Sequence, residues 1–208
     1  MPLKVVIFDC DGVMFDSLAA NKAYYNHILA HFGHPPMSKD ELAYAHIHHV
    51  MDSINHLFRN YPQDLEKANE YRQTVDYTPF LEHMTIEPDL REFLDYLTPR
   101  YQIAISTNRT NTMIPILELF DLEHYFTKVM TAGNLKNPKP HPEALETILD
   151  HCQCKPDEAI YIGDSMVDRE HSANIGMRLI AFKNAELPAE YHVNSFMEIT
   201  KLPFMNDQ

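Results

Sequence analysis

The sequence predicts an α/β fold: a three-layer core with a parallel sheet, and a helical cap inserted after the first strand. Three observations support this prediction. Short apolar runs rich in Ile and Val recur without strict alternation, as in strands buried on both faces. Amphipathic stretches of helical length separate most of these runs. A long segment after the first run contains helix formers, Tyr and His but no convincing strand.

Five apolar runs are predicted to form buried strands, and KVVIFD is the first of them. The predicted strands cover residues 4–9, 102–107, 128–132, 159–164 and 178–182. The helices predicted between them cover about residues 89–98, 111–120, 142–151 and 166–175. Because strands alternate with helices, we expect a parallel sheet with helices on both faces.

The same alternation predicts the domain boundaries. Residues 1–16 and 85–208 are expected to form the core, and residues 17–84 the helical cap. The 208 residues contain no linker rich in Gly, Ser or Pro. One core that carries an insertion is therefore at least as consistent with the sequence as two tandem domains.

Composition and charge exclude several classes of partner. The formal charge of −13 comes from 30 acids against 17 bases, so most of the surface would repel a nucleic-acid backbone. No apolar run approaches membrane-spanning length, and the N-terminus lacks a cleavable signal pattern. The three cysteines match no trusted zinc spacing and cannot all pair internally. We therefore expect a cytoplasmic protein without nucleic-acid or membrane binding; the sequence gives no indication of oligomeric state.

Polar residues follow the predicted strands at the edge where ligands bind in open parallel sheets. These residues are Asp9, Asp11, Ser106, Thr107, Asn108, Asp164 and Asp168. Lys139 lies between two prolines in NPKPHP, and these prolines restrict its backbone. Each residue alone has another interpretation, because Asp, Ser and Thr often cap helices and a single lysine is usually solvated.

Together these side chains predict a cation site. Several carboxylates at one edge repel each other unless a cation or shared protons relieve them. Mg²⁺ is typically held by one or two carboxylates, waters and substrate phosphate oxygens, which suits so sparse a ligand set. A magnesium-dependent reaction at this edge is the resulting hypothesis.

Four motifs carry a resemblance to a known family. FDCDGVMFDS, ISTN, KPHPEAL and IGDSMVDREHSANIGM occur in this order. They resemble the motifs of the haloacid dehalogenase-like hydrolase superfamily, specifically its phosphoglycolate-phosphatase-like branch with a helical cap of the C1 type. The resemblance covers residues 3–182, with the cap matched only in position and helical character. It implies a Rossmann-like core and an Mg²⁺-dependent phosphatase that hydrolyses a small phosphorylated metabolite, such as phosphoglycolate or a sugar phosphate.

The resemblance also implies roles for the acidic residues. Asp9 would be the nucleophile that forms an aspartyl-phosphate, and Asp11 would be the general acid and base. Magnesium would be held by Asp9, the backbone carbonyl of Asp11 and Asp164, with Asp168 as a ligand or as support for the ligands.

The remaining motif residues would bind the transferring phosphoryl group. Thr107 and the backbone amide of Asn108 would donate hydrogen bonds to its oxygens, and Lys139 would neutralise developing charge. Thr107 is preferred over Ser106 because the hydroxyl residue in this family usually precedes an Asn or a similar residue directly. The sequence itself leaves the choice between the two hydroxyls open.

Other activities fit the same core. A phosphomutase of the β-phosphoglucomutase type would use these residues and exclude water through its cap, and a pyrophosphatase would differ only in its leaving group. Dehalogenation is disfavoured because family dehalogenases lack the acid found here as Asp11. A non-catalytic binding protein is disfavoured because no catalytic carboxylate and no lysine is missing.

The cap segment contains a cluster of histidines in AHIHHVMDSINHLF. Helical spacing predicts that His46 and His49 share one face, with His56 two turns beyond His49. His48 and His49 are candidates for substrate recognition, since this part of the cap faces the active site in capped relatives. Solvated or packed histidines are the alternative, and a metal site lacks a Cys or an acid at ligand spacing.

Overall fold

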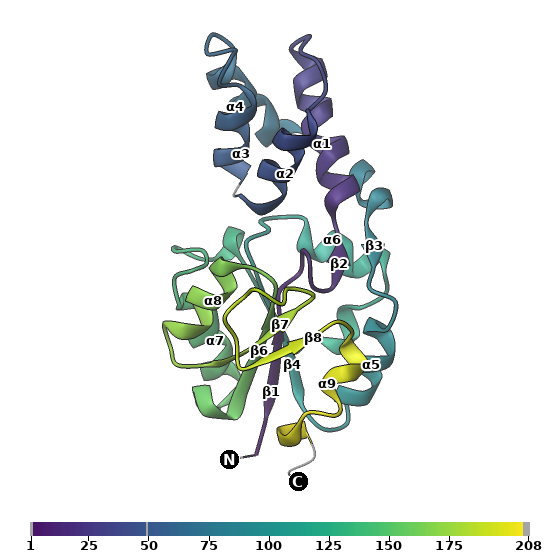
Figure 1. Cartoon of the computed structure of the whole chain (residues 1–208), viewed down its shortest axis with the longest axis vertical. Helices are drawn as coiled ribbons and strands as arrows, with labels where there is room; N and C mark the ends of the chain where they lie inside the picture. The colour runs from purple at the N-terminus through teal and green to yellow at the C-terminus, as the bar shows by residue number, and fades with distance from the viewer. Residues whose placement is uncertain (1, 49, 206–208) are drawn as a thin grey trace. The chain divides into compact units, whose positions relative to one another are not determined.

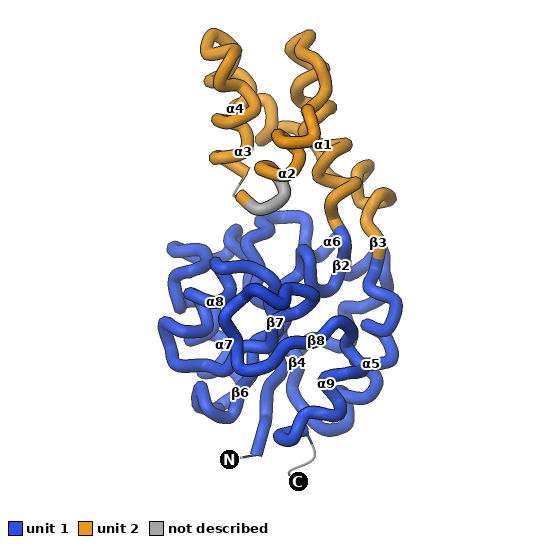
Figure 2. Tube along the Cα trace, in the orientation of Figure 1, with its two compact units in different colours: residues 1–16, 86–208 blue, residues 17–85 orange. Residues whose placement is uncertain are grey.

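The structure, a computed structural model, describes residues 2–48 and 50–205 (Figure 1). It divides the chain into two compact units (Figure 2). Unit 1 combines Met1–Asp16 with Ile86–Gln208, and unit 2 is the continuous segment Ser17–Thr85. The short strands β2 (Phe15–Asp16) and β3 (Thr85–Ile86) pair where the chain leaves unit 1 and returns to it.

The main sheet of unit 1 has six parallel strands, which confirms the predicted fold class. Their order across the sheet is β5 (Lys128–Thr131), β4 (Gln102–Thr107), β1 (Val5–Phe8), β6 (Ala159–Gly163), β7 (Arg178–Phe182) and β8 (Tyr191–Val193). The sequence did not predict β8, because only Val193 of its three residues is buried and no apolar run marks it.

Helices cover both faces of this sheet, and residues of β1 alternate between the two (Figure 1). Val5 and Ile7 belong to a core that includes α7 (Glu143–Cys152). On the opposite face Phe8 packs against Phe93 of α5 (Leu90–Leu97) and Phe196 of α9 (Phe196–Ile199), at ring-centroid distances of 6.0 and 5.7 Å. Because β1 is covered on both sides, all four of its residues are buried.

The remaining elements of unit 1 are short. The helices α6 (Met113–Leu119) and α8 (Met166–Ala173) follow β4 and β6. The 3₁₀ turns are η2 (Glu123–Tyr125), η3 (Ala132–Asn134), η4 (Pro156–Glu158) and η5 (Pro203–Met205). None of the helices in the described part of the chain is long and apolar enough to cross a membrane.

The strand order reverses at β1, which lies between β4 and β6. The chain passes from β1 to β4 and β5 on one side, and then continues with β6 on the other side. In open parallel sheets a crevice forms at such a reversal, outside the carboxyl ends of the strands. Asp9 follows β1 directly at this point.

Unit 2 is helical, with a core rich in aromatic residues. It consists of α1 (Leu18–His31), α2 (Lys39–Ile47), α3 (Val50–Leu57), α4 (Leu65–Thr74) and the 3₁₀ helix η1 (Thr78–His83).

His49, for which a shared helical face with His46 was predicted, lies outside the described residues. Among the described residues, α2 ends before His48 and α3 begins at Val50. The backbone of His48 is extended, with φ −105° and ψ 155°. The Ser53 hydroxyl donates to the His48 carbonyl at 3.3 Å, which satisfies that carbonyl outside a helix.

Candidate active site

Asp9 is held firmly at the carboxyl end of β1. Its backbone N–H donates to the carbonyl of Ile162 at 2.9 Å and so extends the pairing of β1 with β6. Its carboxylate oxygen Oδ1 accepts hydrogen bonds from the Cys10 amide at 2.7 Å and from Lys139 Nζ at 2.8 Å. The side chain is only 11% exposed. Asp9 therefore presents its carboxylate in a fixed position at the strand reversal.

Lys139 connects Asp9 to the rest of the buried site. Its Nζ also donates to Asp168 Oδ1 at 2.7 Å and to the Tyr161 hydroxyl at 3.0 Å. The Asn108 side chain holds the Lys139 backbone, accepting from its N–H at 2.9 Å and donating to its carbonyl at 3.2 Å. Burial opposes the lysine charge, but Asp168 and Asp9 outweigh it and raise the Lys139 pKa well above its usual value. The lysine is therefore a permanent cation.

Asp168 supports both Lys139 and the turn after β6. Its Oδ2 accepts from the Ser165 hydroxyl at 2.7 Å and from the amides of Asp164 and Ser165, each at 3.2 Å. Burial disfavours its charge, but Lys139 and Ser165 together hold its pKa below the usual value. A Cβ on Gly163 would lie 2.5 Å from the Asp168 Cβ, so only glycine permits this close approach.

Three carboxylates lie close enough to share a cation. One oxygen each of Asp9, Asp164 and Asp168 falls within 4.8 Å of the others. Burial, followed by repulsion from Asp9 and Asp168, raises the Asp164 pKa to about 8. Gly12, at φ +73°, leaves the space that Asp164 occupies, because a Cβ there would lie 2.1 Å from Asp164 Oδ2. This strain between acids is what a bound cation would relieve.

The donor set fits a divalent cation with a preference for oxygen ligands. The four acids at this edge face two cations, Lys139 and Arg109, which leaves a formal excess of two negative charges. Carboxylate oxygens are the ligands that Mg²⁺ prefers. Both oxygens of Asp168 already accept hydrogen bonds, so Asp9 and Asp164 are better suited to ligate the ion directly.

Asp11 makes a contact that the sequence analysis did not anticipate. Arg109 binds its carboxylate through two parallel hydrogen bonds, from Nε to Oδ2 at 2.8 Å and from Nη2 to Oδ1 at 2.6 Å. The Asp11 side chain is 34% exposed, and that of Arg109 is 8% exposed. Arg109 directly follows the ISTN motif, so the sequence signal was a guanidinium at the end of a predicted strand.

The hydroxyls of Ser106 and Thr107 have different partners. Ser106 is fully buried, and its Oγ shares a hydrogen bond of 2.9 Å with His171 Nε2. Thr107 Oγ1 accepts from the backbone N–H of Arg109 at 3.2 Å. The Ser106 hydroxyl is therefore engaged by His171, whereas the Thr107 hydroxyl contacts the backbone of Arg109.

Tyr161 and His171 are further buried residues that the sequence analysis missed. The Tyr161 hydroxyl donates to the Ser106 carbonyl at 2.8 Å and accepts from Lys139. Burial, followed by the charge of Lys139, lowers the His171 pKa to about 4, so its imidazole is neutral. The only sequence signals were a phenol within the aliphatic run IYIGD and a histidine one helical turn after Asp168.

The cap histidines are only partly described. His48 is exposed, its Nδ1 lies 2.8 Å from the Tyr44 carbonyl, and its ring stacks on Tyr44 at a centroid distance of 3.7 Å. His56 also stacks on Tyr44, at 3.9 Å. His49 lies outside the described residues. The contacts described for His48 are thus an aromatic stack within unit 2.

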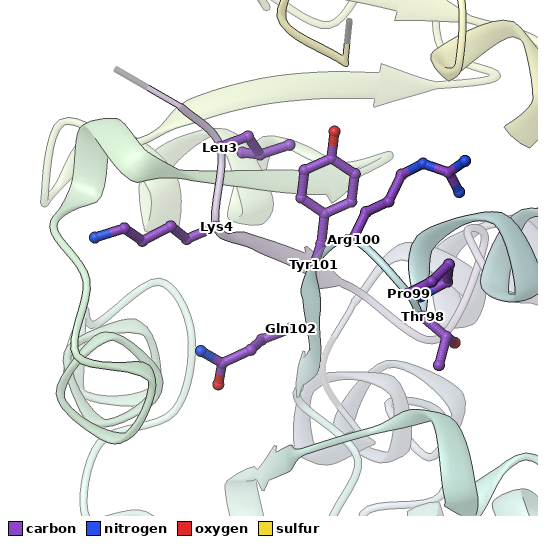
Figure 3. Close-up of a pocket in the computed structure, with 7 residues that line it drawn as sticks. All are labelled: Leu3, Lys4, Thr98, Pro99, Arg100, Tyr101 and Gln102. Atoms are coloured by element: carbon purple, nitrogen blue, oxygen red, sulfur yellow. The ribbon is translucent and has the colours of Figure 1, made fainter. Parts of the chain in front are cut away.

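A pocket lies at the amino ends of β1 and β4 (Figure 3). Its lining residues either precede β1 or lead into β4: Leu3, Lys4, Thr98, Pro99, Arg100, Tyr101 and Gln102. Asp9 and Thr107 follow these same strands at their carboxyl ends. The pocket is therefore separate from the edge where the charged residues meet.

The motif residues are thus assembled at one edge of a parallel sheet, and the sequence pattern of the haloacid dehalogenase-like hydrolases matches residues 6–182. The chain belongs to this family. This result confirms the resemblance that the four motifs predict, and it assigns the chain to a family of hydrolytic enzymes.

Two solved structures share the fold. A hydrolase of this superfamily, subfamily IA, variant 1, from Geobacter sulfurreducens PCA is 39% identical, with a TM-score of 0.84 over 96% of this chain and 95% of that one. A putative phosphoglycolate phosphatase from Lactobacillus plantarum is 16% identical, with a TM-score of 0.84 over 97% and 99% of the two chains. The second likeness concerns the fold alone.

A curated relative matches the chain in sequence. Pyrophosphatase PpaX from Bacillus cereus (strain B4264) is 26% identical over 213 residues, which cover 100% of this chain and 94% of the relative. The insertion and the core are therefore both included in this match.

Proposed function

We propose that this protein is an Mg²⁺-dependent phosphatase that hydrolyses a small phosphorylated metabolite through an aspartyl-phosphate intermediate. One observation carries the proposal: Asp9 lies at the strand reversal, bound to Lys139 and within 4.8 Å of further carboxylate oxygens from Asp164 and Asp168. A fixed carboxylate, a buried cation and a site for a second cation are what an anionic nucleophile needs to approach an anionic phosphate.

In the first step the Asp9 carboxylate attacks phosphorus. An oxygen–phosphorus bond forms to Asp9 while the bond to the leaving oxygen breaks, and Asp11 gives that oxygen a proton. In the second step Asp11 takes a proton from water, whose oxygen attacks phosphorus. The bond to Asp9 then breaks and releases inorganic phosphate, so both aspartates return to their starting states.

The other motif residues bind the transferring phosphoryl group. Thr107 and the Asn108 amide donate to its oxygens, and Lys139 offsets its charge. The contact of Ser106 with His171 favours Thr107 as the hydroxyl donor. Bound Mg²⁺, with Asp9, the Asp11 carbonyl and Asp164 as its protein ligands, would supply charge neutralisation between nucleophile and phosphate. Asp168 would support these ligands through Lys139 and Ser165.

The helical unit 2 would select the leaving group, with His48 and His49 as candidate contacts. Pyrophosphate is a second candidate substrate, because a curated relative of similar length is named a pyrophosphatase. A phosphomutase would use the same core residues but return the phosphoryl group to a sugar. The core residues alone support transfer of a phosphoryl group, but they do not distinguish water from a sugar as the acceptor.

The test is a screen for phosphate release by the full chain. Phosphoglycolate, sugar phosphates, nucleotides and pyrophosphate should be assayed with Mg²⁺ and with a chelator. We expect Mg²⁺-dependent release from at least one of them. Failure of a folded preparation to release phosphate from any would overturn the proposal, and a sugar phosphate isomerised without phosphate release would favour the mutase instead.

A further inference from the structure

We propose that Arg109 binds a second anionic group on the leaving-group side of the substrate, so that the core itself selects diphosphates and phosphate esters with an adjacent carboxylate. The inference rests on the proposed phosphatase function, in which Asp11 faces the leaving oxygen. It adds a residue that determines specificity outside the cap, in a part of the site where the sequence predicts only recognition of the phosphoryl group.

The first argument is the geometry of the contact with Asp11. The guanidinium binds both carboxylate oxygens, at 2.8 and 2.6 Å. Carboxylates and phosphates accept the same parallel pair of N–H donors, which is why arginine recognises both. A ligand anion that reaches Asp11 therefore meets a donor fork of matching shape. Asp11 occupies the place that such an anion would take on the guanidinium.

The second argument is that Arg109 is positioned by contacts other than Asp11. Its N–H donates to Thr107 Oγ1 at 3.2 Å, and its carbonyl accepts from the Ala132 N–H at 2.9 Å. Its Nη1 donates to Thr112 Oγ1 at 3.1 Å. A side chain fixed in this way loses less conformational entropy on binding a ligand. The guanidinium can thus exchange Asp11 for another anion without losing its anchors.

The third argument compares Arg109 with Lys139. Lys139 is bound by Asp9 and Asp168 in a buried network, and removing either acid from it would leave an uncompensated buried charge. The pair of Arg109 with Asp11 includes a side chain that is one-third exposed, so its exchange costs less. Lys139 therefore serves the transferring phosphoryl group, and Arg109 serves an anion beyond it.

Exchange of partners would also release Asp11. When the guanidinium moves to the ligand anion, the freed carboxylate can take up a proton from solvent and then give it to the leaving oxygen. When the substrate has only one anionic group, the Arg109 guanidinium stays bound to Asp11. Selectivity for substrates with two anionic groups then has two sources: the added contact with Arg109 and the release of Asp11 from Arg109.

The test measures binding, without turnover, of three phosphonates to the full chain at fixed free Mg²⁺. Methylphosphonate carries one anionic group, phosphonoacetate adds a carboxylate, and methylenediphosphonate adds a second phosphonate. We expect titration calorimetry to show at least one two-anion probe binding about 10- to 100-fold tighter than methylphosphonate. Tighter binding of phosphonoacetate would indicate a substrate that is a carboxylate-bearing ester, and tighter binding of methylenediphosphonate would indicate a diphosphate.

Variants assign that preference to Arg109. Arg109→Met should remove it, and Arg109→Lys should reduce it, because an ammonium keeps the charge but lacks the fork. Arg178→Met is the matched control, since it removes a guanidinium at the opposite, amino end of β7. Circular dichroism and thermal melting establish folding, and if Arg109→Met is unfolded, Arg109→Lys carries the test.

The inference would be overturned by equal binding of all three probes by the wild type, or by a preference that survives in the folded Arg109 variants. Loss of the preference in Arg178→Met as well would also overturn it, since net charge would then explain the effect. Failure of the phosphatase proposal is separate, because it appears as a lack of Mg²⁺-dependent phosphate release by the wild type.

Discussion

Asp9 and Asp11 are two residues apart, yet the structure surrounds them differently. On the buried side, Asp9 shares Lys139 with Asp168, and the Tyr161 hydroxyl completes the network. On the open side, Asp11 is one-third exposed and is bound by the Arg109 fork. Breaking a pair that is buried on both sides leaves a charge without solvent, whereas Asp11 can be solvated while the largely buried Arg109 passes to another anion. The difference separates a fixed reaction centre from an exchangeable contact.

The largest expected effect concerns the buried side. Asp9→Asn replaces the attacking carboxylate with an amide of nearly equal volume. We expect turnover to fall by about three orders of magnitude or more, the scale lost when a covalent nucleophile is removed. Phosphate release measured on the preferred substrate checks this, with circular dichroism as the control for folding. Near-wild-type turnover would mean that Asp9 does not attack phosphorus.

The next effect concerns the proposed cation ligands. Asp164→Ala removes one of the carboxylates within 4.8 Å of each other, so the Mg²⁺ concentration for half-maximal activity should rise about 10-fold or more. A titration of activity with Mg²⁺ measures the change. Asp157→Ala is a control that removes an acid near the amino end of β6. Unchanged metal dependence in Asp164→Ala would exclude that residue from the cation site.

A smaller effect tests whether the buried network positions Lys139. Tyr161→Phe removes the hydroxyl that donates to the Ser106 carbonyl and accepts from Lys139. The buried partners then lose a hydrogen bond, so the free energy of unfolding should fall by about 1–3 kcal/mol. We also expect kcat to fall several-fold with KM little changed.

Urea unfolding and steady-state kinetics check the Tyr161 prediction. Tyr125→Phe removes an exposed hydroxyl bonded to Asp95 and serves as the control. If Tyr161→Phe lost stability but kept its full kcat, the hydroxyl would support packing without positioning the lysine.

A further effect is a pH dependence of stability that arises at His171, behind the site. The folded-state pKa of His171 is about 4, below the ordinary 6.5, because burial and then Lys139 disfavour its charge. Between these values the unfolded chain binds a proton that the folded chain does not, so stability falls as pH decreases from 6.5 to 4. The loss amounts to about 3 kcal/mol at most, since each pKa unit corresponds to about 1.4 kcal/mol.

Chemical unfolding at pH 7 and pH 4 measures this dependence. His171→Gln should lose less stability over that range than the wild type does. His151→Gln, at an exposed position, should behave as the wild type does. Equal pH dependence in the wild type and His171→Gln would show that another group causes the acid sensitivity.

The fold and the buried side were predictable because their signals are local. A strand buried on both faces must be apolar throughout, so VVIF and its counterparts are visible without knowledge of their neighbours. In a parallel sheet all strands end at one edge, which brings Asp9, Thr107 and Asp164 together whatever the order of the strands.

The open side was not predictable, because its contact depends on pairing between distant residues. The sequence around Arg109 does not predict Asp11 as its partner, and neither does the spacing or the hydrophobic pattern. The same holds for Ser106 and His171, which meet only when α8 packs beside β4. In unit 2 the predicted helical pattern continued through His48, whereas α2 ends before that residue and its carbonyl accepts a hydrogen bond from the Ser53 side chain.

The order of strands in the sheet has a consequence for synthesis of the chain. β1 is made first, but its neighbours β4 and β6 begin only at Gln102 and Ala159. All of unit 2 leaves the ribosome in between, because it is the continuous segment Ser17–Thr85. Until the chain has reached Ala159, the four apolar residues of β1 lack the second of their two neighbouring strands. The place of β1 between β4 and β6 therefore prolongs its exposure to aggregation in the nascent protein.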